Sequence, residues 1–220
     1  MEITYLGHSA FKLKNKFGTV VMDPYDENTG WTLPKQTADV VTVSHDHGDH
    51  NAVDRVKTAA GGEPMVIKVA GDYETRGISV FGVESWHDDK EGAIRGNNLI
   101  FTVLMDGVSV CHLGDLGHKL TDDQVARIGE VDVLLCPVGG YYTLDAKGAV
   151  AVMEQLEPKI FIPMHYRTPL HNANTFADIA PIESFFNEYG IAPAPIKKLE
   201  VQKARLPEET EIVVLDPGIA

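Results

Sequence analysis

A short apolar run that ends in a histidine-rich loop constrains the fold of this chain more than any other feature. Residues 40–43 read Val-Val-Thr-Val, a β-branched run typical of a strand buried on both faces. Directly after it, residues 44–50 read Ser-His-Asp-His-Gly-Asp-His. Imidazole nitrogens and carboxylate oxygens are the ligands that borderline divalent metals prefer. The sequence therefore predicts a metal site at the end of a buried strand, with four ligands from this loop: His45, His47, Asp49 and His50.

The spacing of these four ligands favours two metal ions rather than one. If His45 and His47 point one way while Asp49 and His50 point another, the loop serves two ions side by side, which a single His-x-His pair could not do. Two ions about 3.5–4 Å apart can share a bridging hydroxide and hold a substrate oxygen between them. The alternative is a histidine-rich tract that binds metal without function. Four ligand-type residues directly after a buried strand favour the functional site.

The composition is that of an ordinary globular protein, and it limits the partners. Of the 220 residues 44% are hydrophobic and 23% are charged, so we expect a single domain over residues 1–220. The chain shows neither a signal-peptide pattern nor an apolar stretch of membrane-spanning length, which predicts a cytoplasmic protein with no membrane partner. A formal net charge of −13 disfavours nucleic acid and favours a small-molecule substrate. A homo-oligomer is left open.

Short β-like runs come first along the chain, and helical patterns join them later. The expected strands are 3–6, 10–13, 19–22, 39–44, 65–69, 78–83, 99–105, 108–113, 131–136 and 160–163. Asp106-Gly107 predicts a tight hairpin between two of them. The expected helices are 121–128, 146–156 and 181–188. This order predicts sheets packed on one another with helices outside, a layered α/β arrangement.

The pattern His45-x-His47-x-Asp49-His50 resembles the signature of the metallo-β-lactamase superfamily. The resemblance extends from about residue 3 to residue 166, and it implies a four-layer αβ/βα sandwich. It also implies three further ligands in order, a histidine, an aspartate after glycine and a last histidine, which this chain supplies as His87, Asp115 and His165. One ion would then take His45, His47 and His87, and the other would take Asp49, His50 and His165. Asp115 would bridge the two ions.

Two other segments resemble a subgroup that includes ascorbate-6-phosphate lactonases. They are the opening Ile3-Thr-Tyr-Leu-Gly-His-Ser-Ala-Phe and the run from Pro137 to Asp145. The resemblance places His8 near the metals, although the bare residue could equally be a hydrogen-bonding group at the end of a strand. We expect Asp23, which precedes Pro24, either to order the turn or to orient a ligand histidine as a hydrogen-bond acceptor. We assign His118 and His171 to the surface. The candidate substrate-binding residues are His8, Tyr141, Tyr142 and Arg167.

Metal-dependent hydrolysis is the function that these residues predict. A divalent ion lowers the pKa of its bound water from about 16 to about 7, so a metal-bound hydroxide can attack a small ester, lactone or phosphodiester. Asp49 is the candidate catalytic residue that accepts a proton from this water. We expect two divalent metal ions, zinc by default, with manganese or iron also compatible. The alternatives are a nuclease of the same superfamily and a non-hydrolytic protein, either a metal-binding sensor or a diiron redox protein.

Overall fold

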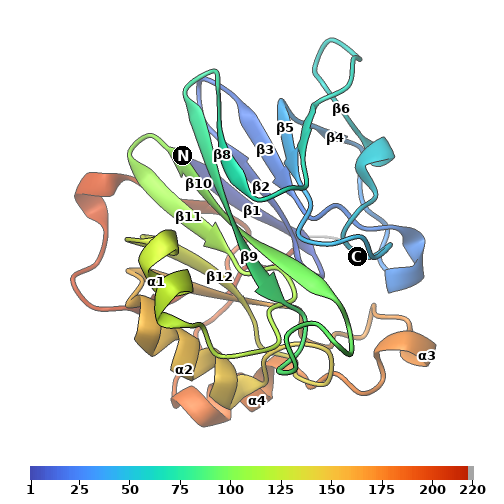
Figure 1. Cartoon of the computed structure of the whole chain (residues 1–220), viewed down its shortest axis with the longest axis vertical. Helices are drawn as coiled ribbons and strands as arrows, with labels where there is room; N and C mark the ends of the chain where they lie inside the picture. The colour runs from blue at the N-terminus through green and yellow to red at the C-terminus, as the bar shows by residue number, and fades with distance from the viewer. Residues whose placement is uncertain (218–220) are drawn as a thin grey trace.

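Two β-sheets packed face to face form the centre of the molecule (Figure 1). The computed structural model describes residues 1–217. The first sheet contains, in spatial order, β14 (Leu199–Glu200), β1 (Glu2–Gly7), β2 (Ala10–Lys14), β3 (Thr19–Met22), β5 (Val40–Thr42) and β7 (Met65–Ile67). The second contains β15 (Glu211–Ile212), β13 (Ile160–Met164), β12 (Val133–Pro137), β11 (Val108–His112), β10 (Asn97–Met105), β9 (Ile78–Trp86) and β8 (Gly71–Thr75).

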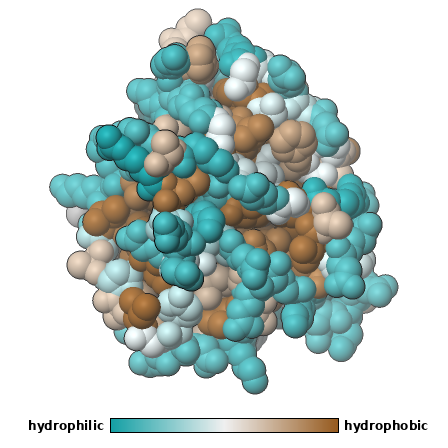
Figure 2. All heavy atoms as spheres, turned by 90° about the vertical axis from the view of Figure 1, so that its left-hand side faces the viewer, coloured by the Kyte–Doolittle hydropathy of each residue, from teal (hydrophilic) through white to brown (hydrophobic). Residues whose placement is uncertain are grey.

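Alternating apolar side chains from both sheets fill the space between them. Phe11 and Val20 of the first sheet lie in one buried cluster with Phe101, Leu135 and Ile162 of the second. Because side chains alternate between the two faces of a strand, the intervening apolar residues of the second sheet point outwards. Helices cover that outer face: α1 (Asp122–Ile128), α2 (Ala146–Leu156) and α4 (Ile182–Tyr189). On the face shown in Figure 2, hydrophobic residues form small patches separated by hydrophilic ones.

The four-layer α/β sandwich is confirmed, with one difference in its outer layer. Over the first sheet this layer is built from irregular chain, residues 25–38 and 52–57, rather than from long helices. It includes the 3-10 helices η1 (Glu27–Thr29) and η2 (Val53–Arg55) and the short strands β4 (Gln36–Thr37) and β6 (Val56–Lys57). Pro24 directly precedes this part of the chain and Pro34 lies within it, and proline disfavours a continuous helix.

The strands and helices of the central sheets and their helical layer agree with the sequence-based expectations. Asp106 and Gly107 have φ angles of 53° and 74°, which is the positive pair that a tight hairpin requires. Thr121 and Gln124 form a reciprocal capping box at the start of α1. The sequence analysis missed β8, which is polar and lies at a sheet edge, and the short elements β14, β15, η3 (Lys203–Arg205) and α3 (Ala173–Phe176). No helix within residues 1–217 is both long enough and apolar enough to cross a membrane.

Four strands end at the same edge of the sandwich. β5 of the first sheet leads into the loop that carries His45. In the second sheet, β9, β11 and β13 end shortly before His87, Asp115 and His165. Loops at the ends of rigid strands are where functional residues commonly gather. The fold therefore brings together ligands that are up to 120 residues apart in the chain.

Candidate metal centre

The carboxylate of Asp115 lies at the centre of the seven predicted ligands. Its Oδ2 lies 3.2 Å from Nε2 of His87 and 3.3 Å from Nε2 of His165. The same oxygen lies 3.9 Å from Nε2 of His45, while Oδ1 lies 3.3 Å from Nε2 of His50. One carboxylate thus faces histidines from three separate loops, which is the position that a bridging ligand requires.

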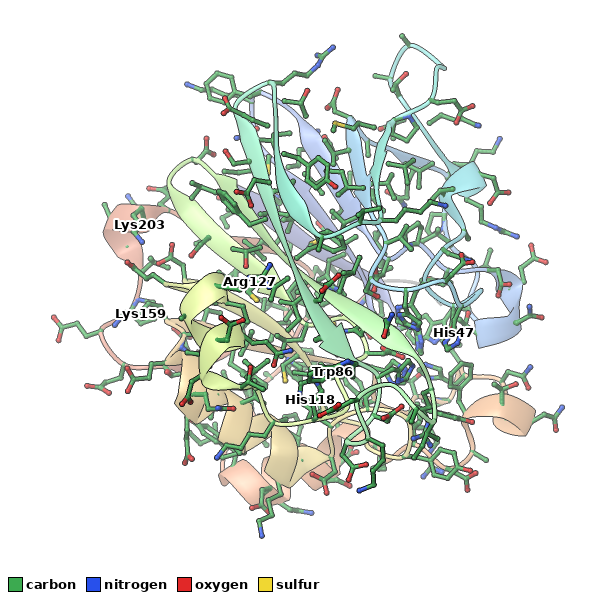
Figure 3. The ribbon with its side chains drawn as sticks, in the orientation of Figure 1. His47, Trp86, His118, Arg127, Lys159 and Lys203 are labelled. Atoms are coloured by element: carbon green, nitrogen blue, oxygen red, sulfur yellow. The ribbon has the colours of Figure 1, made fainter. Side chains whose placement is uncertain are left out.

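The ligand atoms form two neighbouring groups, and the atoms of each group lie within 4.8 Å of one another. One group contains His45, His47 and His87. The other contains Asp49, His50 and His165, together with His8. A third set, which overlaps both, contains His45, His50 and Asp115. The structure therefore brings six of the seven predicted ligands together in the two groups that the resemblance implied, and the seventh, Asp115, lies between these groups; Figure 3 marks the position of His47.

Several buried ligand atoms have no hydrogen-bond partner within the described residues. They are Nε2 of His45, Nε2 of His50, Nδ1 of His87, Oδ1 of Asp115 and both ring nitrogens of His165. A buried polar atom without a partner costs about 1–3 kcal/mol, so such a concentration is unusual in a folded protein. Divalent ions would satisfy nitrogen and oxygen atoms of this kind, so the residues present fit a metal centre.

Asp23 sets the tautomers of two predicted ligands. Its Oδ2 accepts a hydrogen bond of 2.8 Å from Nδ1 of His50, so in the neutral ring Nε2 is the nitrogen that is free to bind a metal. The hydroxyl of Ser44 donates to the same oxygen at 2.5 Å, so the Ser44 oxygen accepts from Nδ1 of His45 at 2.9 Å. Burial alone would raise the pKa of Asp23, but His112 and the hydrogen bonds from His50 and Ser44 lower it below its ordinary value. Asp23 thus orients a ligand histidine in each group.

Two buried histidines form a chain of hydrogen bonds behind Asp49. The backbone N–H of Thr168 donates to Nδ1 of His171 at 3.0 Å, so the proton of this ring lies on Nε2. Nε2 of His171 donates to Nδ1 of His8 at 3.1 Å, and Nε2 of His8 donates to Oδ2 of Asp49 at 3.2 Å. Burial lowers the pKa of His8 to about 4 and that of His171 to about 2, so both rings are neutral near pH 7. His8 therefore holds Asp49 through an N–H group.

The prediction that His171 lies on the surface is wrong. The residue is only 7% exposed, because the rings of Trp31 and Phe176 pack against it at centroid distances of 5.4 and 5.3 Å. His118, which was also predicted to lie on the surface, is half-buried beside Trp86 (Figure 3). Its Nε2 accepts a hydrogen bond of 3.2 Å from the backbone N–H of Trp86.

A cavity of about 450 Å³ opens beside the ligands. Its wall includes the predicted ligands His47, Asp49, His87, Asp115 and His165. Tyr142 and Phe176 also line it, and the hydroxyl of Tyr142 donates to the carbonyl oxygen of Thr175 at 2.9 Å. Tyr141 packs edge-on against Tyr142 with a centroid distance of 4.6 Å, and 58% of it is exposed.

Three of the four candidate substrate-binding residues, His8, Tyr141 and Arg167, do not line this cavity. His8 is fully buried and contacts Asp49 instead. Arg167 lines a separate hollow, and its Nη1 donates to the carbonyl oxygen of Ala177 at 2.8 Å. The arginine that does reach the metal cavity is Arg95, which the sequence analysis did not single out.

Another residue missed by the sequence analysis, Asn98, positions the central carboxylate. Its Oδ1 accepts a hydrogen bond of 2.9 Å from the backbone N–H of Asp115. Its amide nitrogen donates to the carbonyl oxygen of Leu113 and to the hydroxyl of Ser85, each at 2.8 Å. A buried asparagine in a strand carries no sequence signal for this role, because its partners lie on neighbouring strands.

Backbone strain is concentrated around the centre. His8, Asp23, Tyr141 and His165 all have φ angles between 45° and 58°, in the left-handed region that L side chains rarely adopt. Gly139 allows the chain to pass close to His165, because a Cβ atom at Gly139 would lie 2.1 Å from the carbonyl oxygen of His165. Such strain is tolerated where the surrounding packing holds it, and it is common at functional sites.

Comparison with known proteins identifies the family. The β-lactamase superfamily domain matches residues 2–165 of this chain. A UPF0173 metal-dependent hydrolase from Archaeoglobus fulgidus is 34% identical over 195 residues, which cover 76% of this chain and 84% of the relative. The chain belongs to this hydrolase family of the metallo-β-lactamase superfamily. Another member of the UPF0173 family, from Methanopyrus kandleri, is 28% identical over an alignment of 245 positions, which covers 99% of this chain and 98% of the relative.

A solved structure supports the same assignment. The crystal structure from Thermotoga maritima that is described as a Zn-dependent hydrolase of this superfamily shares 38% identity with the chain. The two structures have a TM-score of 0.77, with 97% of each chain covered. The chain is therefore a metal-dependent hydrolase with the metallo-β-lactamase fold.

Proposed function

We propose that this UPF0173 protein is a dinuclear hydrolase of small molecules. One observation carries the proposal: two adjacent groups of ligand-type side chains, several of them with unpartnered buried atoms, face the single carboxylate of Asp115. One ion would bind His45, His47 and His87, and the other would bind Asp49, His50 and His165. Zinc is the default, although the same ligands suit manganese and iron.

The bound ions would supply Lewis acidity and bring the pKa of a bound water to about 7. The chain's own residues would then position the reactants. Asp49, held by the N–H of His8 at 3.2 Å, is proposed to accept a hydrogen bond from the attacking water and so to orient it. Asp23 and Asn98 would fix the ligand histidines and Asp115 before substrate arrives.

The size and charge of the molecule favour a small ester, lactone or phosphodiester. A cavity of about 450 Å³ is within the range of pockets that enclose small ligands. The net charge of −13 disfavours a nucleic acid lying across the surface. The resemblance to ascorbate-6-phosphate lactonases supports including lactones. A cytoplasmic location, and substrate contacts by His8, Tyr141, Tyr142 and Arg167, stay predictions.

A metal titration combined with a substrate screen tests the proposal. The metal-free protein is loaded with zinc, manganese or iron, the bound ions are counted, and hydrolysis of 4-nitrophenyl esters, lactones and phosphodiesters is measured. We expect two ions per chain. In Asp115→Asn, fewer than two ions should bind and activity should fall by more than about 100-fold, the upper end for residues that only support a ligand. Asp72→Asn, on the exposed edge strand β8, is the matched control.

Three results would contradict the proposal. One is a single ion bound per wild-type chain. Another is an iron-loaded protein with a charge-transfer band and no hydrolysis of any substrate, which would favour the redox alternative. Preferential cleavage of generic RNA or DNA would favour the nuclease. If the Asp49→Asn variant binds both ions and keeps full activity, Asp49 does not have the catalytic role.

A further inference from the structure

Asp88, directly after the ligand His87, orders the loop that follows it. Its two carboxylate oxygens accept four backbone hydrogen bonds of 2.7–3.0 Å, from Lys90, Gly92, Ile94 and Arg95. The N–H of His87 donates to the carbonyl oxygen of Gly96 at 3.0 Å and closes the loop at its base. The backbone of Arg95 is therefore fixed relative to a predicted metal ligand.

The side chain of Arg95 rests on two aromatic rings. Its guanidinium carbon lies 5.6 Å from the ring centroid of Tyr142 and 5.9 Å from that of Tyr141. Aromatic faces attract a cation without neutralising its charge. Within residues 1–217 no carboxylate forms an ion pair with this guanidinium. Arg95 thus presents an unneutralised positive charge that is held in place by packing.

The charges around the cavity make this arginine distinctive. Within the described part of the chain, Arg95 is the one lysine or arginine in the cavity wall. Two of the three carboxylates in that wall, Asp49 and Asp115, are predicted metal ligands. The third, Asp26, is engaged by the backbone and side-chain N–H groups of Asn28, each at 2.9 Å. Since the whole chain carries a net charge of −13, the protein as a whole does not attract anions, and a local cation is needed to bind one.

We propose that Arg95 binds an anionic group of the substrate, so that the natural substrate carries a carboxylate or a phosphate in addition to the bond that is hydrolysed. This inference rests on the proposed function. A guanidinium can donate two parallel hydrogen bonds to either oxyanion. Ile94, Tyr142 and Phe176 line the same cavity and would contact an apolar portion of the substrate. Arg95 is then the residue that selects anionic substrates.

Three esters with the same leaving group test this specificity. They are 4-nitrophenyl pentanoate, the 4-nitrophenyl monoester of glutarate, which ends in a carboxylate, and an analogue of equal length that ends in a phosphonate. Arg95→Met, which keeps length and removes charge, should raise KM for an anionic ester by about 10- to 100-fold and leave KM for the neutral ester unchanged. Arg95→Lys should recover part of the loss. Arg127→Met, an exposed arginine on α1, is the matched control (Figure 3).

Calorimetry supplies a readout that does not depend on turnover. Glutarate and propylphosphonate are titrated into metal-loaded wild type and Arg95→Met, and the affinity for one or both should fall by the same 10- to 100-fold. A loss of affinity for glutarate alone would indicate that Arg95 binds a carboxylate of the substrate, and a loss for propylphosphonate alone would indicate a phosphate. A loss for both would indicate that Arg95 accepts either group. Equal KM values for wild type and Arg95→Met, equal losses on neutral and anionic esters, or unchanged anion affinity would overturn the proposal. If wild type hydrolyses none of the three esters, calorimetry tests Arg95 by itself, and the wider screen of lactones and phosphodiesters tests the proposed function.

Discussion

Replacing Asp23 by asparagine separates metal binding from folding. Asparagine has the size of aspartate but offers one acceptor oxygen and one NH2 group. If its oxygen keeps the 2.8 Å hydrogen bond from the N–H of Ser44, its NH2 group faces the Ser44 hydroxyl and Nδ1 of His50. The Ser44 oxygen and Nδ1 of His50 can each accept a hydrogen bond from this NH2 group, but the ring proton of His50 must then move from Nδ1 to Nε2. The Ser44 hydroxyl would in turn donate to Nδ1 of His45, so the ring proton of His45 would move to its Nε2 as well. Every group that contacts the Asp23 side chain stays paired, while two ligand lone pairs are lost.

Metal binding to Asp23→Asn would require the opposite amide orientation. Its NH2 group would then face the N–H of Ser44, and a buried donor without an acceptor costs about 1–3 kcal/mol. This corresponds to a loss of metal affinity of about 5- to 150-fold, in line with the 10- to 100-fold effect of residues that support a ligand. The metal-free variant should change Tm by less than about 4 °C, the equivalent of about 1 kcal/mol in a domain of this size.

Chelator competition and thermal unfolding of the metal-free protein measure the two quantities. Asp132→Asn is the control, because Asp132 is also buried (1% exposed) and accepts hydrogen bonds from the N–H of Ser109 and from Nζ of Lys203. This control should lower Tm and leave metal affinity unchanged. Wild-type metal affinity in Asp23→Asn would refute the tautomer argument, and a large loss of Tm with little loss of metal affinity would refute it too.

Three further changes have defined outcomes. His171→Phe removes the donor that fixes the neighbouring ring behind Asp49, so activity should fall by about 10- to 100-fold with metal content retained; unchanged activity would contradict this role. Gly139→Ala forces a Cβ atom against the carbonyl oxygen of His165, so metal affinity should fall in a chelator titration, and wild-type affinity would show that the loop adjusts freely. Burial alone would raise the pKa of Asp88, but its backbone hydrogen bonds, that of Arg95 first, lower it from 3.8 to about 2. Its contribution to stability is therefore present above about pH 4 and is lost as pH falls through about 2. A carboxyl NMR titration of Asp88 with a midpoint near 3.8 would argue against the stabilisation of this carboxylate by its backbone hydrogen bonds.

The four ligands from His45 to His50 could be predicted from the sequence because they directly follow an apolar strand, and the three later ligands because the family resemblance implied them in this order. A strand end fixes where a residue lies in the fold, and the ends of β5, β9, β11 and β13 meet at one edge. The irregular layer over the first sheet was harder to predict, since its burial depends on residues such as Trp31 that pack against distant parts of the chain.

The residues that support the ligands could not be found in the same way. His171 lies in an irregular segment, and it is buried because Trp31, 140 residues earlier, covers it. Arg167 was favoured because it follows His165 closely, but nearness in sequence does not determine side-chain direction, and its guanidinium turns to Ala177. The position of Arg95 depends on the hydrogen bonds of Asp88, which become visible only in the folded loop.

The ligands come from both sheets, with the His45 loop attached to the first and the three later ligands attached to the second. Bound cations would therefore cross-link the two halves of the sandwich. At a free metal concentration 1,000 times the dissociation constant, metal binding would add about 4 kcal/mol to the free energy of unfolding. The lifetime of this protein in the cell would then depend on the supply of metal as well as on its amino-acid sequence, and metal starvation would remove the enzyme together with its activity.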